Sequence, residues 1–146
     1  MKIFFADQDP LYRAALKYSL DCEEDMIFVG DSWDCMNSVD QMMSNPPDVC
    51  LIDLNGKGFS CLNTIKTLKK NFPHTKVMVL SSYDDENSIT RAVVAGADAY
   101  ILKSIGSREL AQIARALHEG SSITSFYMLN SKQHHSPSLS VSDSNP

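Results

Sequence analysis

The sequence has no long hydrophobic run. Its apolar stretches have the length of a β-strand, and the N-terminal residues 1–6 meet Asp7 before they reach the length of a signal-peptide core. We therefore expect neither a membrane-spanning nor a secreted protein, and we expect a cytoplasmic location.

The sequence also has no excess of basic residues. Its 13 Lys and Arg residues stand against 18 Asp and Glu residues, which gives a net charge of −5. A chain with this balance has no general attraction to a phosphate backbone, so binding to nucleic acid is not expected.

The four cysteines lack the spacing of a metal site. Cys22, Cys35, Cys50 and Cys61 form neither a CxxC pair nor a Cys/His cluster. Each lies in or beside a periodic apolar segment, so we expect reduced thiols that pack as small apolar groups.

Short apolar runs alternate with amphipathic segments in the first 120 residues. The expected strands are 2–6, 26–30, 49–53, 76–80 and 99–102, and the expected helices are 10–20, 33–44, 59–71, 85–95 and 107–119. Near-continuous apolar strands that alternate with helices are typical of a parallel sheet covered on both faces. We predict one doubly wound α/β domain over residues 1–120.

The composition changes after Gly120. Residues 121–146 are rich in serine and show almost no apolar periodicity, so we predict a disordered tail. No segment there has the helical repeat with basic residues that a DNA-binding helix needs.

Polar residues follow several of the predicted strands, at the edge where parallel α/β sheets bind ligands. Asp7, Gln8 and Asp9 follow the first strand, and Asp53 ends the third with Asn55 just beyond it. Ser81 and Ser82 follow the fourth strand, and Lys103 follows the fifth. Acids at this edge suit a divalent cation, and an opposing ammonium and hydroxyl suit a phosphoryl group.

The order Asp7, Asp53, Ser81, Tyr100, Lys103 resembles the receiver domain of two-component response regulators. The stretches ADQDPLYRAAL, DVCLIDLNGKG, KVMVLSSYDDE and AVVAGADAYILKS are most similar to its NarL/FixJ-type branch. The resemblance implies a flavodoxin-like (βα)5 fold with strand order 2-1-3-4-5. It also implies a signalling domain, not an enzyme beyond its own phosphorylation and dephosphorylation.

The resemblance implies a role for each of these residues. Asp53 would accept a phosphoryl group from a histidine kinase or a phosphotransfer protein, and Ser81 and Lys103 would contact the phosphoryl oxygens. Ser81 and Tyr100 would form the switch that alters the surface of the fourth helix, fifth strand and fifth helix, where a partner, an output domain or a second copy binds. Mg²⁺ would be held by Asp7, Asp53, Asn55 and the residue at the position of Gln8.

The sequence departs from the family at that metal site. A second acid usually stands at the position of Gln8, so we expect weak Mg²⁺ binding. Asp9 is followed by Pro10, a combination that favours a helix N-cap over a metal ligand. Gly56 and Lys57 replace the usual Met-Pro, and Ser104 replaces the usual proline after Lys103, so a trans peptide bond is expected there.

Three alternatives stay open at this point. The domain is a pseudo-receiver that binds partners without phosphorylation, or it is the receiver part of a DNA-binding transcriptional regulator. The stretch FFADQDPL is also similar to the first motif of haloacid-dehalogenase-type phosphatases, with Asp7 as nucleophile and Asp9 as acid/base. That third alternative lacks the pair of acids expected after Lys103 and leaves Asp53 unused.

Overall fold

The computed structural model describes residues 1–54 and 59–120, and within them five strands alternate with five helices. The strands are Lys2–Ala6 (β1), Ile27–Ser32 (β2), Val49–Asp53 (β3), Lys76–Ser81 (β4) and Ala99–Leu102 (β5). The helices are Pro10–Asp21 (α1), Cys35–Met43 (α2), Phe59–Asn71 (α3), Glu86–Ala95 (α4) and Ser107–His118 (α5). Asn55, the Gly56 and Lys57 substitutions and the tail 121–146 lie outside the described residues.

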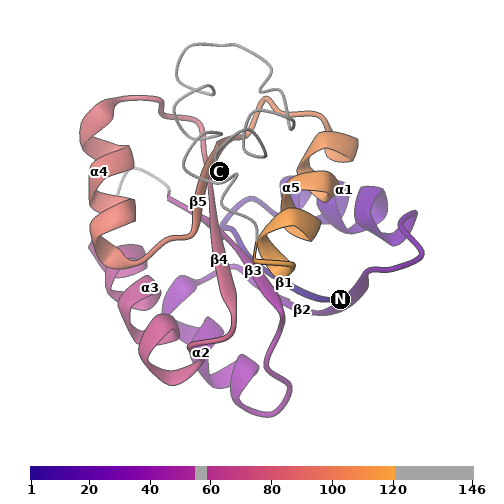
Figure 1. The fold of residues 1–146 in the computed structure, drawn as a ribbon, viewed down its shortest axis with the longest axis horizontal. Coiled ribbons are helices and arrows are strands. Elements are labelled where there is room, and N and C mark those ends of the chain that lie inside the picture. Colours follow the sequence, from indigo (N-terminus) through magenta and orange to yellow (C-terminus); the bar gives the residue numbers. More distant parts are fainter. Residues whose placement is uncertain (55–58, 121–146) are drawn as a thin grey trace, which may run out of the picture.

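The strands form one parallel sheet in the order β2-β1-β3-β4-β5. Helices α1 and α5 pack together on one face, whereas α2, α3 and α4 pack in a row on the other (Figure 1). This is the doubly wound flavodoxin-like fold that the sequence predicts, and the prediction is confirmed.

The predicted element bounds agree with the structure except at β2 and at some element ends. We expected this strand at 26–30, but it spans Ile27–Ser32. The strand lies at the edge of the sheet, and Asp31 and Ser32 pair with Phe5 and Ala6 of β1. Asp31 is exposed, and the buried Ser32 hydroxyl is satisfied by hydrogen bonds with the backbone of Asp34. Polar residues are therefore tolerated there, and the apolar pattern stops before the strand does.

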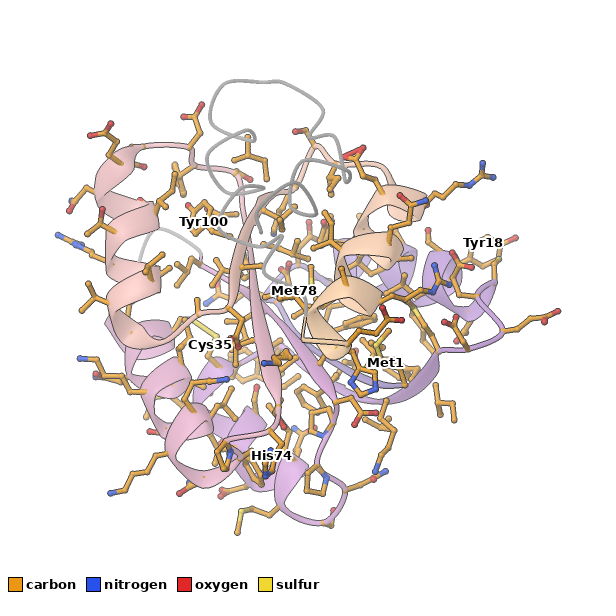
Figure 2. All side chains as sticks on the ribbon, viewed as in Figure 1. Met1, Tyr18, Cys35, His74, Met78 and Tyr100 are labelled. Carbon is orange, nitrogen blue, oxygen red and sulfur yellow. A yellow bond between two sulfur atoms is a disulfide. The ribbon has the colours of Figure 1, made fainter. Side chains whose placement is uncertain are left out.

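The core lies between the sheet and the two helix layers. Met78 of β4 is fully buried in its centre (Figure 2), and α5 contributes the buried face formed by Leu110, Ile113, Ala114 and Leu117. Helix α5 ends as predicted, since Gly120 adopts a positive φ of 81° and donates its N–H to the Leu117 carbonyl. Across residues 1–54 and 59–120, no helix has the length and apolar character needed to cross a bilayer.

An ion-pair cluster joins α5 to the turn between α1 and β2. The Arg115 guanidinium donates two hydrogen bonds of 2.7 Å to the Asp25 carboxylate and lies 3.1 Å from Glu23. The hydrogen bonds from Arg115 lower the pKa of Asp25 to about 2. Arg115 therefore belongs to the surface shared by α1 and α5.

Helix α1 begins with the cap that the sequence predicts. Asp9 has an extended backbone, and its Oδ1 accepts hydrogen bonds from the N–H groups of Leu11 (2.9 Å) and Tyr12 (3.3 Å). Pro10 occupies the first helical position, where a missing N–H costs nothing. This cap fixes the direction of α1 as it leaves the end of β1.

Replacing Asp9 by alanine should lower the free energy of unfolding by about 1 kcal/mol, because two backbone donors lose their acceptor. Asp9→Asn is the matched control: it keeps a capping oxygen and should retain most of the stability. Urea unfolding followed by circular dichroism measures both. Identical midpoints for Asp9→Ala and the unmodified protein would show that the cap contributes nothing in solution.

Candidate functional site

The register of the sheet brings the predicted site residues to one edge. Ala6 pairs with Ile52, so Asp7 leaves β1 beside Asp53 at the end of β3. Asp53 in turn pairs with Leu80, and Ser81 pairs with Leu102, the residue before Lys103. The side chains that end β1, β3, β4 and β5 therefore lie along the same carboxyl edge.

A buried ion triad forms the centre of the site. The Lys103 ammonium donates a 2.8 Å hydrogen bond to Oδ2 of Asp7 and lies 3.0 Å from Oδ1 of Asp53. Both acids are almost completely shielded from solvent, with exposed fractions of 5% for Asp7 and 6% for Asp53. Oδ1 of Asp7 also accepts the Asp9 N–H at 2.8 Å. The lysine thus holds together two carboxylates that would otherwise repel each other.

The environment shifts the pKa values of two members of this triad. Burial raises the pKa of Asp53, the charge of Asp7 raises it further, and Lys103 opposes both effects. Burial alone would lower the pKa of Lys103, but its hydrogen bonds and charge interactions with Asp7 and Asp53 outweigh burial and raise that pKa. Asp53 is therefore a more basic carboxylate than usual beside a firmly charged lysine, which suits a nucleophile for an electrophilic phosphorus.

Two residues of α1 complete the site, and sequence reasoning missed both. The ammonium of Lys103 lies 4.5 Å from the centroid of the Tyr12 ring, within the range of a cation–π interaction. The guanidinium of Arg13 donates to the backbone carbonyl of Asp7, and its Nε donates to Asp31 at 3.0 Å. The available signal was the predicted helix start at Pro10, because the first turn of a helix that follows a strand end must lie next to that end.

Ser81 and Tyr100 meet at the backbone of Tyr83. Ser81 is fully buried and its Oγ accepts the Tyr83 N–H at 3.0 Å, while the Tyr100 hydroxyl donates to the Tyr83 carbonyl at 2.6 Å. Tyr100 is 1% exposed and points inward (Figure 2), and burial raises the pKa of its hydroxyl. The structure therefore joins the predicted switch residues through the loop between β4 and α4.

Only part of the predicted metal set can be placed. Gln8 has an exposed side chain, Asn55 lies outside the described residues, and within residues 1–54 and 59–120 no three acids, histidines or cysteines are grouped as a metal site. Mg²⁺ commonly takes one or two carboxylates and keeps several waters. Asp7 and Asp53 fit such an ion, although Lys103 already engages one oxygen of each.

The backbone between β5 and α5 agrees with expectation. The described residues contain no cis peptide bond, so Ser104 follows Lys103 through a trans bond. The Lys103 N–H donates to the Ser81 carbonyl at 2.9 Å, which fixes the lysine beside β4.

Comparisons with known proteins agree with this geometry. Residues 3–115 match the family model of the response regulator receiver domain. The chain is 32% identical over 121 residues to the oxygen regulatory protein NreC of Staphylococcus haemolyticus, which covers 82% of this chain and 56% of that protein. It is 27% identical over 123 residues to the response regulator protein VraR of Staphylococcus saprophyticus, covering 84% of this chain and 59% of that one.

Among solved structures, the signal receiver domain of NarL from Mycobacterium tuberculosis has the same fold. It superposes with a TM-score of 0.76 at 21% identity and covers 82% of this chain and 96% of that domain. The chain spans slightly more than half the length of the curated relatives named above. The family match, the strand order and the placement of the acids agree, and the chain belongs to the receiver domain family of two-component response regulators.

Proposed function

We propose that Asp53 accepts a phosphoryl group from a phosphohistidine of a histidine kinase or phosphotransfer protein. The observation that carries this proposal is the triad of Asp7, Asp53 and Lys103 at the carboxyl edge of the sheet. The domain is a signalling module in this proposal, and its chemistry is limited to its own phosphorylation and dephosphorylation. A cytoplasmic location stays a prediction from the sequence.

The transfer joins two anionic groups, so electrostatics set much of its barrier. An Asp53 oxygen attacks phosphorus, the P–N bond to imidazole breaks with its electron pair staying on nitrogen, and an acyl phosphate forms. Lys103, 3.0 Å from Asp53, offsets the repulsion and is within reach of the new phosphoryl oxygens. Mg²⁺, held weakly by Asp7 and Asp53 and by the carbonyl of Asn55, would supply further positive charge to those oxygens.

The contacts around Tyr83 support Ser81 and Tyr100 as the switch. When the Ser81 hydroxyl turns to a phosphoryl oxygen, it releases the Tyr83 N–H, and Tyr100 is bonded to the carbonyl of that same residue. Changes at Ser81 and at Tyr100 therefore both act on the loop before α4. We infer that α4, β5 and α5 carry the signal to a partner, an output domain or a second copy.

One observation favours the pseudo-receiver alternative. Gln8 replaces an acid, and one oxygen of each remaining carboxylate is already engaged by Lys103. Such a domain would bind partners but take up no phosphoryl group. No observation here favours the alternative of a DNA-binding regulator over a separate receiver.

Asp53→Asn should abolish the intact-mass increase of one phosphoryl group that we expect when the protein is incubated with Mg²⁺ and acetyl phosphate. Asp9→Asn is the matched control, because it removes a nearby charge but keeps its capping oxygen. It should still be labelled. Label on Asp53→Asn, or none on the unmodified protein with either acetyl phosphate or a phosphorylated kinase, would contradict the proposal.

Gln8→Asp should tighten Mg²⁺ binding roughly tenfold, equivalent to ~1.4 kcal/mol, because a hard cation gains an acid ligand. Titration of the fluorescence of Trp33 with Mg²⁺ measures the affinity. Gln41→Asp adds the same charge at an exposed position of α2 and should leave the affinity nearly unchanged. An equal gain in both variants would mean that general charge, not ligation, is responsible.

Charge reversal on α4 should disturb self-association or partner binding without slowing phosphorylation of Asp53. Arg91→Glu is the test, because Arg91 is exposed on α4, the helix that follows the loop of Tyr83. Lys17→Glu on α1 is the control. Arg115 is unsuited to this test because it is bound to Asp25 and Glu23. Sedimentation and pull-down measure the effect. If Lys17→Glu loses binding and Arg91→Glu does not, the binding surface lies on α1 and α5.

A further inference from the structure

Two cysteines that the sequence predicts to be reduced are joined in the structure. Cys35 and Cys61 form a disulfide, with Cα atoms 5.5 Å apart, within the normal range for such a bond (Figure 2). The prediction of free thiols is therefore wrong for this pair, whereas Cys22 and Cys50 are free. The 26-residue separation carries no pairing signal; the fold creates the pair by placing the starts of α2 and α3 side by side.

The disulfide lies next to the proposed phosphoryl acceptor. Cys35 is the first residue of α2, and its Sγ is 3.9 Å from the backbone carbonyl oxygen of Asp53. Cys61 lies in the first turn of α3, the element that follows Asp53 in the chain. One covalent bond therefore fixes the start of α3 to a residue that touches the end of β3.

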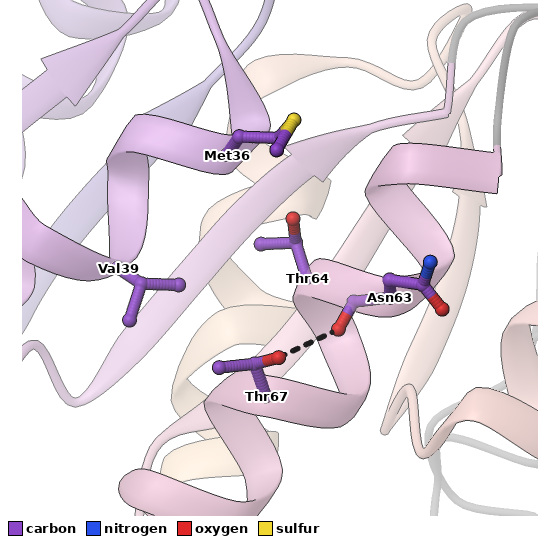
Figure 3. A pocket seen from close by; sticks show the side chains of 5 residues that line it. All are labelled: Met36, Val39, Asn63, Thr64 and Thr67. Atoms are coloured by element: carbon purple, nitrogen blue, oxygen red, sulfur yellow. Dashed lines mark hydrogen bonds between the residues drawn. The ribbon is translucent and has the colours of Figure 1, made fainter.

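Helices α2 and α3 pack against each other, but a gap remains between them beside this bond. A pocket of about 300 Å³ separates the two helices (Figure 3), and it is lined by Met36, Val39, Asn63, Thr64 and Thr67. Met36 directly follows Cys35. The disulfide therefore adds a covalent link to two helices that also pack against each other.

The two sulfur atoms differ in access. Cys35 is buried, with 8% of its surface exposed, whereas Cys61 is only partly buried. An external thiol therefore reaches Cys61 first. Cys35, held against Asp53, is the sulfur that leaves.

We propose that Cys35 and Cys61 form a reversible thiol–disulfide exchange site whose redox partner is a glutathione-type thiol or a protein dithiol. An external thiolate attacks Sγ of Cys61, the S–S bond breaks, and its electron pair leaves on Cys35, which takes up a proton. A second thiolate attacks the external sulfur of the mixed disulfide and releases Cys61. Two thiols are thereby oxidised to a disulfide as the pair gains two electrons and two protons, and the reverse reaction closes the bond.

Reduction of the disulfide lowers the reactivity of Asp53, a consequence that rests on the proposed function. Reduction removes the covalent link between the first turn of α3 and Cys35, the residue of α2 that touches the Asp53 carbonyl. A site held in its reactive geometry works faster than one that must be ordered first. The oxidised form is therefore phosphorylated faster than the reduced form, by threefold or more.

The first experiment counts thiols. The Cys22→Ser protein, which lacks the exposed free cysteine, is equilibrated in buffers of graded ratios of reduced to oxidised glutathione, quenched with acid and alkylated in denaturant. Peptide mass analysis should show Cys35 and Cys61 gaining and losing protection together, while Cys50 stays alkylated throughout. Alkylation of both Cys35 and Cys61 at every glutathione ratio, or protection of one of them without the other, would overturn the proposed exchange site.

The second experiment measures phosphorylation by acetyl phosphate of the oxidised and the reduced Cys22→Ser protein. The control protein carries both Cys22→Ser and Cys61→Ser, and its phosphorylation rate should be the same under oxidising and reducing conditions. Equal rates, or a faster reduced form, would overturn the effect on Asp53.

Amide hydrogen exchange of α3 separates this inference from the proposed function. If neither redox form is phosphorylated by acetyl phosphate or by a phosphorylated kinase, the proposed function fails. Faster amide exchange of residues 62–68 in the reduced form than in the oxidised form would still support the disulfide as a constraint on α3. Equal exchange in the two forms would overturn that effect as well.

Discussion

The position of the Lys103 ammonium between two buried carboxylates is the constraint on which the rest of the site depends. Asp7 and Asp53 are both nearly inaccessible to water, and two such charges side by side are costly unless a cation compensates them. Lys103 supplies that cation from the end of β5. Because a buried ion pair seldom stabilises a fold more than apolar packing would, its presence is better explained by chemistry than by stability.

The parallel sheet makes this arrangement possible. In the order β2-β1-β3-β4-β5, β1 and β3 are neighbours, and β5 is separated from β3 by β4 alone. The long side chain of Lys103 spans the distance from β5 to β3, which a shorter side chain would not. The same order places Ser81 on β4, between the acid and the lysine, and puts Tyr100 on β5 beneath the loop that begins α4. The positions of the acids, the lysine, Ser81 and Tyr100 thus follow from one strand order.

Much of this fold could be predicted from the sequence because its signals are local. Continuous apolar runs mark the inner strands, the Asp9-Pro10 pair marks the start of α1, and the period of α5 marks its buried face. The carboxyl ends of parallel strands lie along one edge of a sheet, so Asp7, Asp53 and Lys103 could be grouped without coordinates. Edge strand β2 was placed less well because its last residues are polar and pair only on one side.

The features that could not be predicted depend on contacts between elements that are far apart in the sequence. The ring of Tyr12 meets Lys103 only after the start of α1 and the end of β5 have come together at the carboxyl edge of the sheet. Cys35 meets Cys61 only after two crossover connections have placed α2 beside α3. Arg115 shows the same limit. Its sequence neighbours suggested the surface of α4 and α5, but its carboxylate partners come from the turn between α1 and β2.

Gln8 changes the electrostatic balance of the site in two opposing ways. Without a third acid in the cluster, a divalent cation is attracted less strongly, but an anionic phosphodonor is also repelled less. Asp9 does not restore the missing ligand, since its side chain caps α1, yet its negative charge still contributes to the raised pKa of Asp53. Lys103 then neutralises a larger share of the remaining negative charge than it would in a three-acid pocket. The Lys103 ammonium, in contact with both carboxylates, therefore weighs more in the electrostatic potential of this two-acid site than it would beside three acids.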